Sequence, residues 1–337
     1  MLSGDNNQLL PLPFNELWVV DFEFTAPSGG RQGPVCMVAI ERLSGRVIRM
    51  WADELAELDE APFDTGPHSL FIAYYASAEI GCFLALDWKL PDRVLDLYCE
   101  FRAETNGTSV LSGRGLIGAL AHYGLDSISI VEKKDMIELI LSGGPWTPDQ
   151  KVAILDYCET DVRALEHLLP VMVPAITQST QRLGWALLRG RYMTAVARME
   201  WNGTPIDVQI LERLRNYWDD IKISLIKEID KDYCIYEGLT FKSALFENWL
   251  IRNDIPWPRL ESGALALDDN TFRQVAKAHP LVSPLRELRH ALGTLRLNNL
   301  HVGSDGRNRC LLSPLQSKTG RNQPSNAKFI FGPSVWL

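Results

Sequence analysis

The sequence lacks the closely spaced cysteines of a metal or disulfide framework. Its six cysteines lie far apart, and no two of them form a Cys-x-x-Cys pattern. This spacing excludes the usual zinc and dithiol motifs, and scattered single cysteines are typical of a reducing compartment. We therefore expect a cytoplasmic protein.

Long apolar runs are also missing. No stretch approaches the roughly 20 apolar residues that a membrane-spanning helix needs, and residues 1–14 lack the basic start and apolar run of a signal peptide. We expect no membrane span and no membrane partner. A hydrophobic content of 46% and a charged content of 23% are typical of globular proteins, and 337 residues predict two or three domains.

Positive charge is scarce in the first part of the chain. The net charge is −8, but residues 1–181 carry 12 Lys and Arg against 26 Asp and Glu, giving −14, whereas residues 182–337 carry 22 against 16, giving +6. An acidic half that could hold cations therefore precedes a basic half that could hold phosphates. Ordinary solvated surface is the alternative explanation of both halves.

Strand patterns dominate the first hundred residues. Residues 17–20 form a continuous apolar run that predicts a buried strand ending at Asp21. Further strands are expected at 35–40, 46–51, 70–75 and 94–97. Helices are expected at 53–61, 76–88, 113–123, 132–141 and 148–168. This order predicts an α/β fold with a mixed sheet that is flanked by helices.

Helical periodicity dominates the second half. Helices are expected at 181–201, 208–232, 241–253 and 271–302. Pro170 and Pro174 mark the end of the preceding unit. We therefore expect one domain over residues 1–178 and a second, mainly helical domain over residues 179–337.

Two acids follow the first expected strand. Asp21 and Glu23 are two residues apart, so they would face the same side of an extended chain and could hold one cation between them. Carboxylates next to a buried apolar run are rarely buried themselves unless they are paired or bind a metal. Two exposed acids at a strand end are the alternative.

A second candidate lies in the helix expected at 148–168. Tyr157 and Asp161 are four residues apart and share one helix face, and the apolar residues around them indicate a helix that is buried on one side. Between the two features, a strand–helix step places Glu79 just inside a helix. Each pattern alone is common by chance, whereas their order along one chain is much more specific.

The order and separation of these three motifs resemble the proofreading 3′→5′ exonuclease domain of family A DNA polymerases. That domain belongs to the DEDD superfamily in its tyrosine form and has a ribonuclease H-like fold with a five-stranded sheet. The resemblance implies that Asp21, Glu23 and Asp161 bind catalytic metal ions and that Tyr157 orients the attacking water.

The second motif departs from the family pattern. Glu79 stands where the family has an aspartate, and its longer side chain could still reach a metal but would re-space the site. Asp87 and Asp96 are the fallback acids, and we expect Asp96 to be structural.

The resemblance also implies two divalent ions, Mg²⁺ or Mn²⁺. Phosphodiester hydrolysis develops charge on the attacking and the leaving oxygen, and two hard cations held by carboxylates stabilise both. Carboxylate oxygens favour Mg²⁺ or Mn²⁺ over zinc. The expected substrate is DNA, preferably single-stranded 3′ ends.

The basic half carries family-like stretches as well. Residues 190–207 resemble the link between exonuclease and thumb in family A polymerases, and residues 319–321, Thr-Gly-Arg, resemble the stretch before the first catalytic motif of the palm. The sequence stops at Leu337, before such a motif, so we expect no polymerase activity and allow for a separate polymerase partner. The residues expected to contact nucleic acid are Phe24, Tyr75, Arg191, Arg309, Lys318 and Arg321, with Arg189 and Arg307 as further candidates for phosphate contact.

Two other functions stay open. The altered second motif would also suit a catalytically weakened DNA-binding or scaffold module related to family A polymerases. An RNA-processing exonuclease on the same fold is the other alternative, which the polymerase-like tail disfavours. Metal-dependent melting separates an active site from a decayed one, because bound ions stabilise the folded state.

Overall fold

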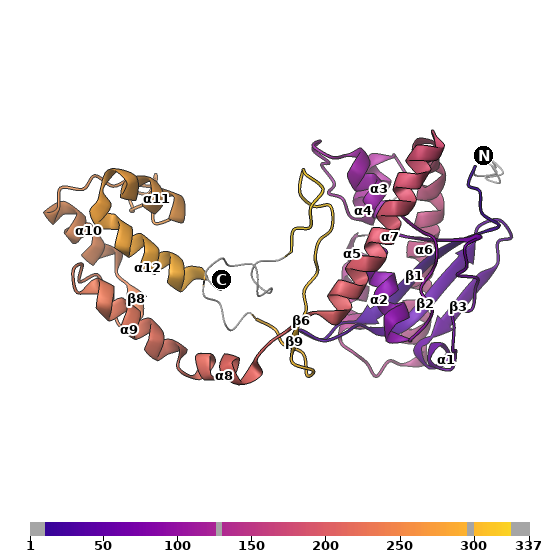
Figure 1. Cartoon of the computed structure of the whole chain (residues 1–337), viewed down its shortest axis with the longest axis horizontal. Helices are drawn as coiled ribbons and strands as arrows, with labels where there is room; N and C mark the ends of the chain where they lie inside the picture. Colours follow the sequence, from indigo (N-terminus) through magenta and orange to yellow (C-terminus); the bar gives the residue numbers. More distant parts are fainter. Residues whose placement is uncertain (1–10, 126–129, 295–299, 325–337) are drawn as a thin grey trace. The chain divides into compact units, whose positions relative to one another are not determined.

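A computed structural model describes residues 11–125, 130–294 and 300–324 of the protein (Figure 1). The described chain forms two compact units. The first contains the residues up to Thr204 and the segment that begins at Val302, and the second contains Pro205–His301.

A five-stranded sheet forms the centre of the first unit (Figure 1). Its strands are β1 (Glu16–Thr25), β2 (Gly33–Glu41), β3 (Val47–Trp51), β4 (Ser69–Ala73) and β5 (Val94–Asp96), in the order β3-β2-β1-β4-β5. β1 pairs antiparallel with β2 and parallel with β4. The predicted mixed sheet is therefore confirmed, and β1 is its central strand.

β1 is apolar on both faces because both faces of the sheet are covered. Leu17 and Val19 lie in one core cluster, whereas Trp18, Val20 and Phe22 lie in the other. Strands that are buried on both faces read as continuous apolar runs rather than as an alternating pattern. This explains the run from which the strand was predicted.

Helices form the layers on the two sides of the sheet. They are α1 (Ala52–Ala56), α2 (Ser77–Ala85), α3 (Leu97–Glu104), α4 (Leu116–His122), α5 (Ile130–Leu141), α6 (Pro148–Ile176) and α7 (Thr180–Asn202). α6 shares the core cluster of Leu17 and Val19, and α2 and α7 share the cluster of Trp18. The helix α3 was not expected from the sequence.

α6 is longer than predicted. It continues to Ile176 although Pro170 and Pro174 lie inside it. A proline inside a helix costs about 3 kcal/mol or more. Met172 and Val173, between the two prolines, are buried, and the packing of these last turns offsets that cost.

The second unit is mainly helical, as predicted. It contains α8 (Val208–Asn216), α9 (Trp218–Asp230), β7 (Tyr236–Glu237), β8 (Thr240–Phe241), α10 (Ser243–Arg252), α11 (Asp269–Ala278), the 3₁₀ helix η1 (Pro280–Val282) and α12 (Ser283–Thr294). Its core gathers aromatic rings around Phe246. The single helix expected over 208–232 is two helices that meet at Tyr217.

The chain then comes back to the first unit. We call residues 302–324 the return segment. Its strand β9 (Arg307–Asn308) pairs with β6 (Thr204–Pro205), where the first unit ends. The predicted boundary after residue 178 falls between α6 and α7, whereas α7 and the return segment belong to the first compact unit. The assignment of residues 1–178 and 179–337 to two functional domains stays a prediction.

Within residues 11–125, 130–294 and 300–324, no helix has both the length and the apolar character that crossing a bilayer requires.

Candidate active site

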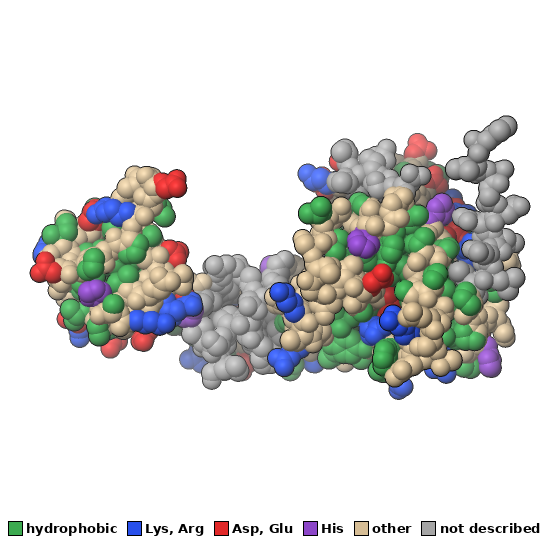
Figure 2. Space-filling view, turned by 90° about the horizontal axis from the view of Figure 1, so that it is seen from above, with side chains coloured by type: hydrophobic (Ala, Val, Ile, Leu, Met, Phe, Trp, Pro, Cys, Tyr) green, Lys and Arg blue, Asp and Glu red, His purple; other side chains and the backbone are tan. Residues whose placement is uncertain are grey.

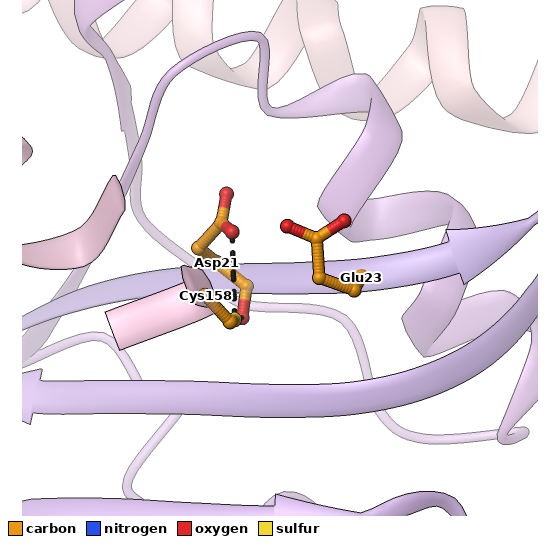
Figure 3. Close-up of side chains that lie close together, drawn as sticks. All are labelled: Asp21, Glu23 and Cys158. Atoms are coloured by element: carbon orange, nitrogen blue, oxygen red, sulfur yellow. Dashed lines mark hydrogen bonds between the residues drawn. The ribbon is translucent and has the colours of Figure 1, made fainter. Parts of the chain in front are cut away.

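The second half of β1 presents two carboxylates on one side of the sheet. The sequence predicted that this strand ends at Asp21. β1 instead runs on to Thr25 beside β2, with an irregular pairing between Glu23 and Phe24. Asp21 and Glu23 project from the same side of the strand, as their spacing predicts (Figure 3). Both are partly exposed, and one oxygen of each and the Cys158 sulfur lie within 4.8 Å of one another.

Cys158 was not among the expected site residues. Its thiol donates to the backbone oxygen of Asp21 at 3.4 Å and to Oδ2 of Asp21 at 3.5 Å (Figure 3). Burial raises the pKa of the Cys158 thiol well above its ordinary value, and a hydrogen bond with Cys36 and the charge of Asp21 add to the rise. The thiol therefore stays protonated and leaves the carboxylate oxygens as donors for a hard cation. Its position directly after Tyr157 gave no signal, because adjacent residues on a helix point in different directions.

Glu79 joins these acids from the first turn of α2. It is 3% exposed, and its Oε2 accepts the backbone N–H of Phe22 at 2.8 Å. β1 pairs with β4 only as far as Val19, so the edge of β1 beyond that residue is open to Glu79. Burial raises the pKa of Glu79, and the charges of Asp21 and Glu23 raise it further. Three carboxylates therefore lie within electrostatic reach of one another.

α6 brings the two remaining predicted residues to the same place. Tyr157 and Asp161 are buried. Burial raises the pKa of the Tyr157 phenol above its ordinary value, and the charges of Asp161, Glu23 and Asp21 raise it further. The phenol stays protonated and shares a hydrogen bond with Asp161. In the described chain, neither Asp161 nor Glu79 belongs to the group of ligand atoms within 4.8 Å of one another.

An arginine on β3 holds α6 at this position. Arg49 donates to Asp156 at 2.5 Å and to Glu159 at 2.9 Å, and these acids flank Tyr157 and Cys158 on the helix. The hydrogen bond with Asp156 and the charge of Glu159 raise the pKa of Arg49. The ion pairs are partly exposed, so we expect them to orient the helix more than to stabilise the fold.

Asp96, a fallback acid, has a structural role, as expected. It is fully buried and accepts the backbone N–H groups of Tyr75, Ala76 and Cys99. Burial raises the pKa of Asp96 to about 6, although these hydrogen bonds oppose the rise. Tyr75 has a φ of 72°, which is uncommon for a residue with a side chain. Asp96 therefore fixes the turn that leads into α2. The other fallback acid, Asp87, is exposed.

Some buried acids of the described chain make structural contacts, and others belong to the candidate site. The five buried acids among the described residues are Glu41, Glu79, Asp96, Glu100 and Asp161. Glu41 accepts the backbone N–H of Leu17 on β1 and those of Leu43 and Ser44 in the turn after β2, and Glu100 pairs with Arg189 at 2.6 Å. With these acids assigned to structural contacts, Glu79 and Asp161 are the buried acids of the candidate site. Arg189, a candidate for phosphate contact, is held by Glu100 instead.

Arg309, another expected DNA contact, is held by protein groups. Its side chain is 7% exposed and pairs with Asp305 at 2.6 Å. It donates to the backbone oxygens of Trp201 at 2.8 Å and Gly29 at 3.2 Å. These groups enclose most of the guanidinium, and its contact with DNA stays a prediction. Arg307 likewise donates to backbone oxygens of the turn after α7.

The other predicted contacts remain accessible. Arg191, Lys318 and Arg321 are exposed, and Phe24 and Tyr75 are partly buried. On the face seen in Figure 2, Lys and Arg side chains are scattered over both units and do not form one patch. The contact of these five residues with nucleic acid stays a prediction.

Fold and site together define an α/β protein with an acidic cluster at the end of its central strand. No family model matches the sequence, and no curated protein matches it. The fold is similar to a solved structure of the POL domain of Pol1 from M. smegmatis in complex with DNA primer-template and dNTP. The TM-score is 0.55 and the sequence identity 15%, and the match covers 92% of this chain and 51% of that chain.

The similarity concerns the fold. It confirms the predicted α/β class with a helical region after the sheet, and it relates the fold to that of a DNA polymerase. This chain spans about half the length of its neighbour, with 51% of that chain covered.

Proposed function

We propose that the protein is a metal-dependent 3′→5′ exonuclease that removes nucleotides from single-stranded DNA ends. The observation that carries the proposal is the meeting of two acids on β1, one acid on α2 and a tyrosine–aspartate pair on α6. The fold neighbour was solved with DNA primer-template, which supports DNA as the substrate class.

The donor set suits hard divalent cations. Asp21, Glu23 and Asp161 would hold Mg²⁺ or Mn²⁺, because carboxylate oxygens favour these cations over zinc. Glu79 uses Oε2 for the N–H of Phe22, which leaves Oε1 as the oxygen that we assign to a cation. When bound, the cations neutralise charge on the reacting phosphate and lower the pKa of a water ligand.

Tyr157 has the properties of a group that orients water. Its raised pKa keeps the phenol protonated at neutral pH, so it does not act as an anionic nucleophile. The hydrogen bond with Asp161 fixes the direction of the hydroxyl group. The phenol oxygen can then accept a hydrogen bond from the attacking water and hold it in line with the phosphorus atom.

A labelled oligonucleotide tests the proposal. A single-stranded DNA labelled at its 5′ end is incubated with the protein in Mg²⁺, in Mn²⁺ and in chelator. We expect a ladder that shortens from the 3′ end with either cation, and no ladder in chelator or with Asp21→Asn. Asp87→Asn is the matched control, because it makes the same change at the exposed fallback acid.

The outcomes separate the competing readings. Equal digestion by the Asp21→Asn variant would exclude the assigned site. DNA binding without a ladder in either cation would favour a catalytically weakened binding module instead. Faster degradation of an RNA strand of the same sequence would identify a ribonuclease.

A further inference from the structure

The return segment lies close to the start of α2, which carries Glu79. Glu200, at the end of α7, connects the two. Its Oε1 accepts the backbone N–H of Leu312 at 2.6 Å, and α7 packs against α2, which brings this carboxylate near the hydroxyl of Ser77. Ser77 is the first residue of α2 and is buried. A hydrogen bond to a charged, largely buried group is among the stronger ones in a protein.

The residues around Glu200 come from both sides of this contact. Burial raises the pKa of the Tyr75 phenol and of the Cys310 thiol, and the charge of Glu200 raises both pKa values further. Tyr75 precedes α2 and holds a positive φ of 72°. Cys310 and Leu312 belong to the return segment. One carboxylate therefore lies between the return segment and the strained entry to α2.

A second connection runs through the loop that follows β1. Arg309 of the return segment donates to the backbone oxygen of Gly29 at 3.2 Å. A Cβ atom on Gly303 would lie 2.6 Å from the same oxygen, so the two backbones approach too closely for any other residue at 303. At the end of this loop, Gln32 donates to the backbone oxygen of Ala78 at 3.2 Å. Ala78 immediately precedes Glu79.

Both connections end at the first turn of α2. We propose that the return segment is a positioning element of the active site: through Glu200 and the loop 26–32, it fixes Glu79 against the β1 carboxylates. The inference rests on the proposed function. The four acids must keep their positions to within a few tenths of an ångström if they are to share cations. Residues that contact metal ligands from the protein side commonly fix those positions. The return segment thus acts on the site through contacts within the protein.

The test compares Glu200→Ala with Glu200→Gln. Alanine removes the acceptor of the Leu312 N–H, whereas glutamine keeps a carbonyl oxygen in its place. Ser304→Ala is the control, because Ser304 is exposed in the same segment. For each protein we measure kcat and KM on a 5′-labelled oligonucleotide and Mn²⁺ affinity by calorimetry without DNA.

We expect Glu200→Ala to lower kcat and to weaken Mn²⁺ binding, each by about tenfold, while KM for DNA stays within about twofold. Glu200→Gln and Ser304→Ala should match the wild type. A folded Glu200→Ala variant with wild-type kcat and Mn²⁺ affinity overturns the inference, as does a loss that glutamine fails to restore.

A milder variant keeps the test decisive if Glu200→Ala does not fold. Gln32→Ala removes the hydrogen bond to Ala78 and leaves Glu200 in place, and we expect a drop of about threefold in kcat and in Mn²⁺ affinity. Wild-type values for this variant then count against the inference.

Mn²⁺ affinity also separates the proposed function from the positioning role. A wild-type protein without nuclease activity whose Mn²⁺ binding still depends on Glu200 refutes the proposed function and keeps the positioning role.

Discussion

Replacing Glu200 by glutamine is expected to stabilise the protein above neutral pH. Burial raises the pKa of Glu200 from its ordinary 4.5 to about 7, although the Leu312 N–H and the Ser77 hydroxyl oppose the rise. The folded state therefore prefers the neutral carboxyl group. The stability that this group contributes is fully present below pH 4.5 and is lost as the pH rises through about 7.

The magnitude follows from the difference between the two pKa values. At about 1.4 kcal/mol per pH unit, the change from 4.5 to about 7 corresponds to about 3 kcal/mol. Glutamine is neutral at every pH and can still accept the Leu312 N–H. The variant should therefore be more stable than the wild type by up to about 3 kcal/mol at pH 8, and equally stable near pH 4.

Urea unfolding in metal-free buffer measures this difference. The free energy of unfolding is determined by circular dichroism at pH 4 and pH 8 for the wild type, for Glu200→Gln and for Glu57→Gln, which makes the same change at an exposed site. The same pH dependence for both variants, or a Glu200→Gln variant that is less stable than the wild type at pH 8, would show that Glu200 does not prefer its neutral form in the folded state.

Three further predictions concern the site and its support. Mg²⁺ at one hundred times its Kd should stabilise the protein by about 2.7 kcal/mol, and thermal melting should show that Asp21→Asn removes this effect; an equal rise in the variant would contradict it. Tyr157→Phe should lower the single-turnover rate by about tenfold to one-hundredfold without changing the Kd for single-stranded DNA, and an unchanged rate would exclude its role with water. Asp96→Ala leaves three buried N–H groups without their acceptor and should cost about 3 kcal/mol in urea unfolding, whereas a loss below about 1 kcal/mol would show that water replaces the carboxylate.

The parts of the fold that the sequence predicted are those set by local pattern. The central strand β1 is buried on both faces, so its apolar run is unambiguous, and the spacing of two between Asp21 and Glu23 fixes their common side. The spacing of four between Tyr157 and Asp161 does the same on α6. The extension of α6 beyond Pro170 was not predictable, because it depends on packing against distant residues.

The contacts that link distant segments escaped sequence analysis for the same reason. The exposed or buried state of an arginine depends on partners far along the chain. Arg309 looked like a phosphate ligand in a basic tail, but Gly29 accepts one of its hydrogen bonds across 280 residues of sequence. Cys158 was missed because its relation to Asp21 exists only after α6 packs on β1.

The charge asymmetry of the chain takes a different meaning once these contacts are known. The surplus of basic residues after position 181 suited either a surface for phosphates or ordinary solvated surface. Arg189 and Arg309 instead pair with acids of their own unit, and Arg307 binds backbone oxygens. The charges of Arg189 and Arg309 are thus compensated locally and contribute little to the field that a DNA strand would meet. Part of the basic half therefore serves to assemble the unit that holds the acidic cluster, and only its exposed members can act on nucleic acid directly.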